Sequence, residues 1–154
     1  MNHNLTIALI EPEIPGNTGA IARTCVATNT HLIVVGPTPF EITDSKVKRA
    51  GLDYWKWLKI DILKDFSEFE EKFSHRRWVL TTAREGQPYH EFQFKKDDII
   101  LFGKETKGLD KELVHSKKHN VITLPMWGET RSLNLANAST VFLYEAYRQI
   151  GFPS

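Results

Sequence analysis

The segment Ile99-Ile100-Leu101-Phe102-Gly103-Lys104-Glu105-Thr106-Lys107-Gly108-Leu109 joins a short apolar run to a polar turn that contains two glycines. A run of four apolar residues ended by glycine is typical of a strand that is buried on both faces. Glycines in a turn let the backbone come close to a ligand, and open α/β sheets place their sites where strands end. The segment therefore predicts a buried strand followed by a loop suited to a ligand.

Similar apolar runs occur on both sides of this segment, and each is bounded by polar residues, glycine or proline. They are Ile7–Ile10, Leu32–Val35, Trp78–Thr82 and Val121–Leu124. Most of the intervening segments suit helices, and alternation of strands with helices predicts an α/β fold with a mostly parallel sheet flanked by helices on both faces. The chain has 154 residues, which fits a single domain spanning residues 1–154.

Two helices are indicated by their patterns. Ser67 and Glu70 form a capping-box pattern at the start of one, which has three phenylalanines at helical spacing. The other, Leu133–Gln149, is apolar on almost every side, so it is expected to pack on its own sheet and against a second subunit. Burial inside one subunit is the alternative, although a small domain has little interior to surround a terminal helix.

Composition excludes several classes of protein. Hydrophobic residues make up 41% and charged residues 25%, which is ordinary for a folded globular chain. No stretch approaches the roughly 20 apolar residues that cross a bilayer, and Met1–Asn4 lacks the features of a signal peptide, so we expect a cytoplasmic protein without membrane contact. The single cysteine, Cys25, gives no disulfide or zinc cluster, and no metal is expected. The net charge of +1 restricts any nucleic-acid surface to a local patch.

A second candidate loop, Glu11–Gly19, follows the first strand and leads into a helix expected to begin near Ala20. Asn17 or Thr18 could cap this helix, and the free amides of its first turn favour an anion. Arg23 is expected on that first turn, where a guanidinium could hold a phosphate with two hydrogen bonds. A merely solvated arginine is the alternative.

A third loop, Leu124–Asn134, follows the last strand and runs into the terminal helix. Asn134, Asn137, Val141 and Tyr144 lie close to one stripe of that helix. Buried asparagines need partners, which could be loop caps and polar networks or a ligand. The dinucleotide fingerprint G-x-G-x-x-G is absent after every strand, and so is a Walker A loop, so a different loop system must hold any cofactor.

The three loops together resemble the three signature motifs of the SPOUT (α/β-knot) RNA methyltransferases. The matching residues are Glu11–Pro15 with Asn17-Thr18-Gly19 and Arg23, Phe102-Gly103 with Glu105-Thr106 and Gly108, and Pro125-Met126 with Arg131–Leu135 and Asn137. Within that family the chain is most similar to the small TrmL/YibK-type tRNA 2′-O-methyltransferases that act at the wobble nucleotide. The likeness covers nearly the whole chain, including Ala50–Tyr54 and Tyr144–Gln149.

The resemblance implies S-adenosyl-L-methionine-dependent methylation of the ribose 2′-hydroxyl of cytidine or modified uridine 34 in the tRNA anticodon loop, with S-adenosyl-L-homocysteine as product. It also implies a C-terminal trefoil knot and a homodimer formed through the terminal helix. Two alternatives remain open at this point: a methyltransferase that acts on ribosomal RNA, and a non-catalytic knotted RNA-binding module.

The resemblance further implies which residues form the site. Adenosylmethionine would contact Leu80, Thr81, Gly103, Glu105, Gly108, Leu124, Met126, Ser132, Leu133 and Asn137. Arg23, Ser132 and Tyr144 are the catalytic candidates, and for the last two loop structure and interface packing are equally good explanations. Because a guanidinium stays protonated, we expect Arg23 to clamp the target phosphate or the developing alkoxide rather than act as a base.

The expected tRNA contacts are Asn17, Arg23, Lys46, Lys48, Arg49 and Arg131. Lys56 and Lys59 add charge nearby, and Tyr54, Trp55 and Trp57 could stack on an unpaired base. A solvated charged surface is the alternative. The aromatic residues between the cations favour contact with RNA, and a dimer would present the patch twice.

Overall fold

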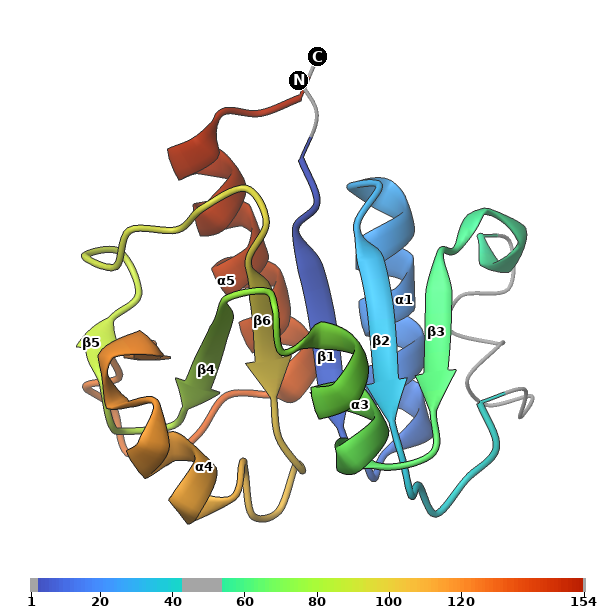
Figure 1. The fold of residues 1–154 in the computed structure, drawn as a ribbon. Helices are drawn as coiled ribbons and strands as arrows, with labels where there is room; N and C mark the ends of the chain where they lie inside the picture. Colours follow the sequence, from blue (N-terminus) through green and yellow to red (C-terminus); the bar gives the residue numbers. More distant parts are fainter. Residues whose placement is uncertain (1–2, 43–53, 154) are drawn as a thin grey trace.

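A computed structural model describes residues 3–42 and 54–153, which form one seven-stranded sheet with helices on both faces (Figure 1). The strands lie in the order β3-β2-β1-β6-β4-β7-β5, and every pairing between them is parallel. Their bounds are β1 Thr6–Ile10, β2 His31–Val35, β3 Ile60–Leu63, β4 Trp78–Thr82, β5 Gln87–Pro88, β6 Ile99–Phe102 and β7 Val121–Thr123. The predicted α/β fold with a parallel sheet is confirmed.

The helices form a layer on each side of the sheet (Figure 1). One layer contains α1 (Pro15–Ala27) and α5 (Leu135–Ile150), and the other contains α3 (Phe66–Phe73) and α4 (Lys111–Ser116). Two short 3₁₀ helices, η1 (Trp55–Trp57) and η2 (Lys118–Asn120), precede β3 and β7. All strands point the same way, so the loops that follow them gather at one edge of the sheet.

Strand β1 shows how the sequence builds a core on each face. Successive side chains of a strand point to opposite faces. Ile7 and Leu9 belong to the cluster beneath α1 and α5, whereas Ala8 and Ile10 belong to the cluster beneath α3 and α4. All five residues of β1 are buried, which explains why the central strands have continuous rather than alternating apolar runs.

All five predicted strands are present, and two further strands were not predicted. Strand β3 has the sequence Ile60-Asp61-Ile62-Leu63, of which the middle two residues are exposed, and β5 has only two residues, one of them Pro88. Both lie at the edges of the sheet, where little burial is required. Neither therefore contains an apolar run that a pattern search detects.

The predicted start of the first helix was wrong. Helix α1 begins at Pro15 and not near Ala20, and its N-cap is Ile14, which makes no side-chain cap bond. Proline at the first helical position has the backbone angle that a helix needs. Asn17 and Thr18 therefore lie inside the helix and do not cap it, and Arg23 lies in the third turn rather than the first.

The predicted cap of α3 was wrong as well. Asp65, not Ser67, caps the helix by accepting a hydrogen bond from the Glu68 amide at 3.0 Å. Glu68 reaches back to the Lys64 amide at 3.1 Å, which is a reciprocal arrangement two residues earlier than expected. The earlier start includes Phe66 in the helix, and Phe66 packs edge-to-face against Trp78 of the sheet.

Helix α5 begins at Leu135, two residues later than predicted, because Asn134 caps it by accepting a bond from the Asn137 amide at 3.1 Å. One side of the helix is buried in the core, including Phe142, Leu143, Ala146 and Tyr147. The other side is open: Val141 is 41% exposed and Tyr144 is 45% exposed. Complete burial of this helix within one subunit is therefore ruled out.

Among the described residues, no helix has the length and apolar character to span a membrane.

Candidate functional site

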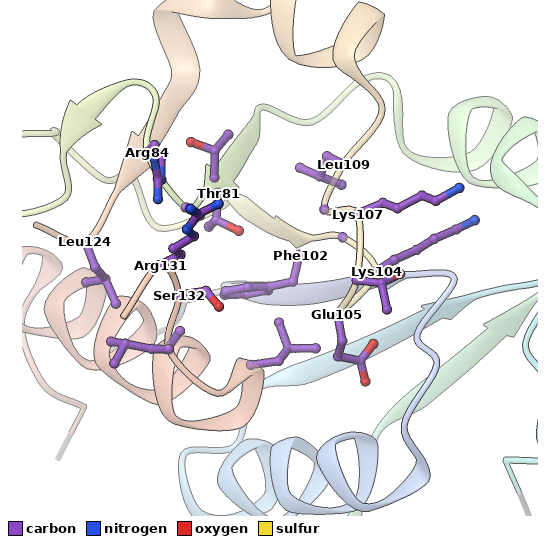
Figure 2. A pocket seen from close by; sticks show the side chains of 18 of the residues that line it. Thr81, Arg84, Phe102, Lys104, Glu105, Lys107, Leu109, Leu124, Arg131 and Ser132 are labelled. Atoms are coloured by element: carbon purple, nitrogen blue, oxygen red, sulfur yellow. The ribbon is translucent and has the colours of Figure 1, made fainter. Parts of the chain in front are cut away.

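A cavity of about 680 Å³ lies where β1, β4, β6 and β7 end (Figure 2). All three loops predicted from the sequence contribute to it, and a fourth segment after β4 joins them. The lining residues include Ile14 and Asn17, Thr81–Glu85, Phe102–Leu109, Leu124 with Met126, and Arg131–Leu135. The convergence of the three loops is the feature that makes this edge of the sheet a candidate active site.

The loop after β6 turns so tightly that only glycine fits at its start. A Cβ atom on Gly103 would lie 2.1 Å from the backbone carbon of Gly108 and 2.2 Å from the Leu109 nitrogen, both far inside contact distance. Gly108 has a φ of 71°, and its amide donates to the Lys104 carbonyl at 2.8 Å. The two glycines therefore fix the backbone that forms one wall of the cavity.

Carboxylates join this loop to the loop after β1. Glu105 accepts hydrogen bonds from the amides of Glu13 at 2.9 Å and Ile14 at 2.8 Å, at the positive end of α1. In return, Glu13 accepts from the amide and the hydroxyl of Thr106, at 3.0 and 2.8 Å, and these bonds hold the pKa of Glu13 below its usual range. The anion that the sequence predicted at this helix N-terminus is thus the protein's own Glu105.

Asn17 connects all three loops. Its side-chain amide donates to Glu105 at 3.3 Å, and its side-chain oxygen accepts from Asn134 at 3.1 Å. Asn134 also caps α5, so the chain of hydrogen bonds runs from the β6 loop through α1 to the start of the terminal helix. Asn17 and Asn134 thus join a polar network between loops, and both also line the cavity.

The segment after β4 is held just as firmly. The Thr81 hydroxyl donates to the Leu101 carbonyl at 2.9 Å, and the Thr82 hydroxyl donates to the Glu85 carbonyl and accepts from the Glu85 amide. A Cβ on Gly86, whose φ is 101°, would lie 2.4 Å from the Val121 carbonyl oxygen. The turn that carries Arg84 therefore has a fixed backbone beside the cavity.

Cations outnumber carboxylates around the cavity. Among the residues that the structure describes, five basic side chains line it, namely Arg84, Lys104, Lys107, Lys111 and Arg131, against the two carboxylates Glu85 and Glu105. Glu105 is already engaged by the β1 loop, and Lys104 lies 3.8 Å from Glu11. In Figure 2, Lys104 and Lys107 extend to one side of the cavity, while Arg84 and Arg131 lie on the other side. The cavity is thus suited to an anionic substrate.

Most of the cofactor and substrate residues expected from the resemblance line this one cavity. They are Asn17, Thr81, Gly103, Glu105, Gly108, Leu124, Met126, Arg131, Ser132 and Leu133. The Leu80 side chain is buried in the core beneath α3 and α4, because β4 alternates its side chains between the two faces. Asn137 lies outside the cavity and is exposed, and its amide donates to Asn134.

Two catalytic candidates lie outside the cavity of their own chain. Arg23 is exposed on α1, donates to the Tyr54 hydroxyl at 3.2 Å and stacks 4.8 Å from the centre of that ring. Tyr144 is exposed on α5. Neither residue is among those that line the cavity, whereas Ser132 is. The structure therefore brings together most of the predicted cofactor residues but not the full predicted catalytic set.

Several predicted tRNA contacts, Lys46, Lys48 and Arg49, lie outside the described residues. The nearby aromatic residues are described: Trp57 is 60% exposed, with the Lys56 ammonium 4.4 Å from its ring centre, whereas Trp55 packs against the core. Of these two tryptophans, Trp57 is the one with an open aromatic face.

Arg84 was missed by sequence reasoning, although the same rule that found the other loops applies to it. It follows a predicted strand and precedes Gly86 in a polar turn. Residues Thr82–Glu85 contain no apolar pattern and no recognised motif, so the only indication was their place at the carboxyl end of β4.

Comparison with known proteins identifies the family. The model of the SpoU rRNA methylase family matches residues 4–144, and the chain belongs to that family. The tRNA (cytidine(34)-2′-O)-methyltransferase of Saccharophagus degradans is 40% identical over 148 residues, covering 95% of this chain and 96% of that protein. The enzyme of the same name from Aeromonas hydrophila is 40% identical over 149 residues, covering 96% of each. The resemblance to the SPOUT methyltransferases is confirmed.

Similar solved structures support the same family assignment. One that reports the 2-OH methylation of C/U34 on tRNA is 39% identical, with a TM-score of 0.91, and the match covers 96% of this chain and 97% of that one. The SpoU methyltransferase AviRb from Streptomyces viridochromogenes, in complex with AdoMet, is 28% identical with a TM-score of 0.86. That match covers 97% of this chain but only 62% of AviRb.

Proposed function

We propose that this protein methylates the ribose 2′-hydroxyl of the wobble nucleotide, cytidine or modified uridine 34, in tRNA, with S-adenosyl-L-methionine as methyl donor. The observation that carries the proposal is the likeness over almost the full length of both chains to relatives named for that reaction. The convergence of all three motif loops on one cavity supports it. The ribosomal RNA methyltransferase of Sinorhizobium meliloti is 26% identical, and only 58% of its length is matched.

The cavity fits the proposed cofactor. Its volume lies within the range of about 300–1,000 Å³ that is usual for small-molecule sites. Apolar side chains such as Leu109, Leu124 and Met126 can cover an adenine ring, and the backbone of the Gly103–Gly108 turn is open for hydrogen bonds. When bound, adenosylmethionine would supply a methyl group already activated by the sulfonium.

The residues of the chain would then mainly position the acceptor. Alignment of an acceptor with an activated group can account for much of a rate enhancement, and the preformed hydrogen bonds among Glu105, Asn17 and Asn134 provide that rigidity. Ser132 lines the cavity and could donate a hydrogen bond near the acceptor oxygen. Arg23 would stabilise the target phosphate or the developing alkoxide as a fixed positive charge.

The position of Arg23 supports a dimer. Arg23 and Tyr144 lie on α1 and α5, helices that pack together on one face of the sheet, and both are outside the cavity of their own chain. The side of α5 that carries Val141 and Tyr144 is exposed. A second copy packed there would cover this apolar side and bring Arg23 of one chain toward the cavity of the other.

The dimer has a direct test. Replacing Val141 with Glu places a charge in the proposed interface, and we expect light scattering to give the monomer mass, with loss of methyl transfer. Lys72→Glu, on the opposite helix layer, is the matched control and should stay dimeric. A wild-type protein that is monomeric at micromolar concentration would contradict the dimer.

The C-terminal knot is part of the same proposal. Strand β7 lies between β4 and β5, and the chain then returns past β4 to α5, which packs near β6. A knot forms when the chain end passes through a loop made by an earlier part of the chain, and a path from β7 back past β4 is compatible with that. Slow refolding from denaturant, relative to other α/β domains of this size, would support the knot.

Nucleoside mass spectrometry tests the function. Purified protein incubated with adenosylmethionine and unmodified tRNA should yield 2′-O-methylcytidine or a 2′-O-methyluridine derivative that maps to position 34, and cells that lack the protein should lose it. Such a substrate is found in the cytoplasm, where we expect the protein to act. Methylation of ribosomal RNA instead, or binding without transfer, would replace this function with one of the two alternatives.

A further inference from the structure

Trp127 is the most open large apolar side chain among the described residues. It is 92% exposed, whereas the next such residue, Phe152, is 62% exposed. Trp127 lies in the loop after β7, between Met126 and Arg131, both of which line the cavity. An indole with both faces in water beside a candidate active site is placed for a partner that stacks on it.

Two guanidinium groups accompany it. Arg84 and Arg131 are exposed, line the same cavity and lie in the same part of it (Figure 2). Among the described residues, neither side chain has a hydrogen-bond or ion-pair partner. The turn that carries Arg84 is fixed by the Thr82 hydroxyl, so this charge is held at the cavity by a rigid backbone.

The combination matches the chemistry of one unpaired nucleotide. Aromatic side chains stack on splayed bases of single-stranded RNA, and guanidinium groups bind backbone phosphates. The excess of basic residues over carboxylates around the cavity favours an RNA over a second copy of this protein as the partner of Trp127, because a second copy carries almost no net charge.

We propose that Arg84, Trp127 and Arg131 form a nucleotide-binding rim of the cavity, in which Trp127 stacks on an unpaired anticodon-loop base and the two arginines bind the adjoining phosphates. This inference rests on the proposed function and adds two residues, Arg84 and Trp127, to the recognition of the tRNA. The rim holds the strand, and the residues deeper in the cavity act on the ribose.

The test compares five variants of the full-length protein. Trp127→Ala should weaken binding of a tRNA anticodon stem-loop about tenfold, because one base stack is lost, and Trp127→Phe should retain most of the affinity. Phe152→Ala, an exposed aromatic residue near the C-terminus, is the matched control. Arg84→Gln should lower the slope of log affinity against log salt by about one, whereas Lys96→Gln, before β6, should leave it unchanged.

Four outcomes would overturn the rim. Unchanged stem-loop affinity in both Trp127→Ala and Arg84→Gln, with a wild type that binds and methylates tRNA, rejects it and spares the proposed function. Loss of adenosylmethionine affinity in Arg84→Gln, measured by calorimetry, would show that Arg84 binds the cofactor carboxylate instead. Conversion of Trp127→Ala to a monomer would show that a second copy covers the indole. A wild type that binds no tRNA rejects both the rim and the proposed function.

Discussion

Charged residues have different roles at the edge of the sheet where the parallel strands begin and at the edge where they end. At the edge where strands begin, Arg77 forms two 2.7 Å bonds with Asp98, which is 1% exposed, and Arg76 donates to the Asp97 carbonyl and to Thr6. At the edge where strands end, Arg84 and Arg131 face a cavity without partners among the described residues. Charges at one edge stabilise the fold, whereas charges at the other are available for a ligand.

The terminal helix is anchored at the first of these edges. Near the C-terminus of α5, Tyr147 is 2% exposed, bonds to the Thr30 hydroxyl at 2.5 Å and donates to the Thr28 carbonyl at 3.2 Å. Burial raises the pKa of Tyr147. The N-terminus of the same helix faces the cavity through Asn134. One helix thus joins the rigid edge to the ligand-binding edge.

The largest effect is expected from breaking the buried ion pair. Asp98→Ala leaves Arg77 without its partner, which typically costs about 3–5 kcal/mol in the free energy of unfolding. Urea denaturation should show this loss, while the fraction that remains folded binds adenosylmethionine normally. Asp97→Ala, an exposed neighbour, is the control, and equal effects of the two changes would contradict the comparison of the edges.

Arg23 should have the largest effect on activity. Arg23→Ala removes the proposed charge at the acceptor, and loss of one such group commonly lowers kcat by about 10² to 10³. Adenosylmethionine affinity, measured by calorimetry, should stay within a factor of two or so, since Arg23 lies outside the cavity of its own chain. Loss of cofactor binding with kcat preserved would contradict the role.

Substitutions at two glycines test the role of the turn after β6 at the ligand-binding edge. Gly103→Ala forces a methyl group into the Gly108 backbone, and strain of this kind costs about 1–3 kcal/mol. We expect cofactor affinity to fall with it. Gly16→Ala meets no atom within 4 Å and lies in α1, so it should leave stability equal or slightly higher. Cofactor affinity that is unchanged in Gly103→Ala would count against the role of this turn.

The sequence predicted what depends on local pattern. Buried central strands have continuous apolar runs, and the loops that follow them could be placed at one edge by the geometry of a parallel sheet. The edge strand β3 was missed because Asp61 and Ile62 face solvent. The predicted position of Arg23 on α1 was wrong because the helix begins earlier, at Pro15, whose fixed backbone angle suits the first helical position.

The residues of the candidate site also fall into two groups, those that belong to a sequence motif and those that only the structure identifies. Gly103, Gly108 and Met126 belong to motifs that a resemblance recovers, and all three line the cavity. Arg84 and Trp127 belong to no motif, and only their exposure and placement single them out. Contacts between loops, such as that of Asn17 with Asn134, require the folded chain, because 117 positions separate the two residues.

The smallest expected effect concerns pH. The hydrogen bonds from Thr106 lower the pKa of Glu13, so the stabilisation from the ionised carboxylate is fully present above the ordinary glutamate pKa of about 4.3 and is lost as the pH falls through the lower value of the folded state. Cofactor affinity should therefore weaken slightly in acid. Glu13→Gln should show a flatter profile than the wild type between about pH 3 and 5, and identical profiles would contradict this contact.

Hydrogen–deuterium exchange with and without adenosylmethionine tests the central claim most directly. If the loops form one cofactor site, added adenosylmethionine should slow exchange in residues 81–86, 103–109 and 124–134 together, over the same range of ligand concentration, with little change at Arg76–Trp78. Protection in only one of these segments, or in none at saturating ligand, would contradict the account.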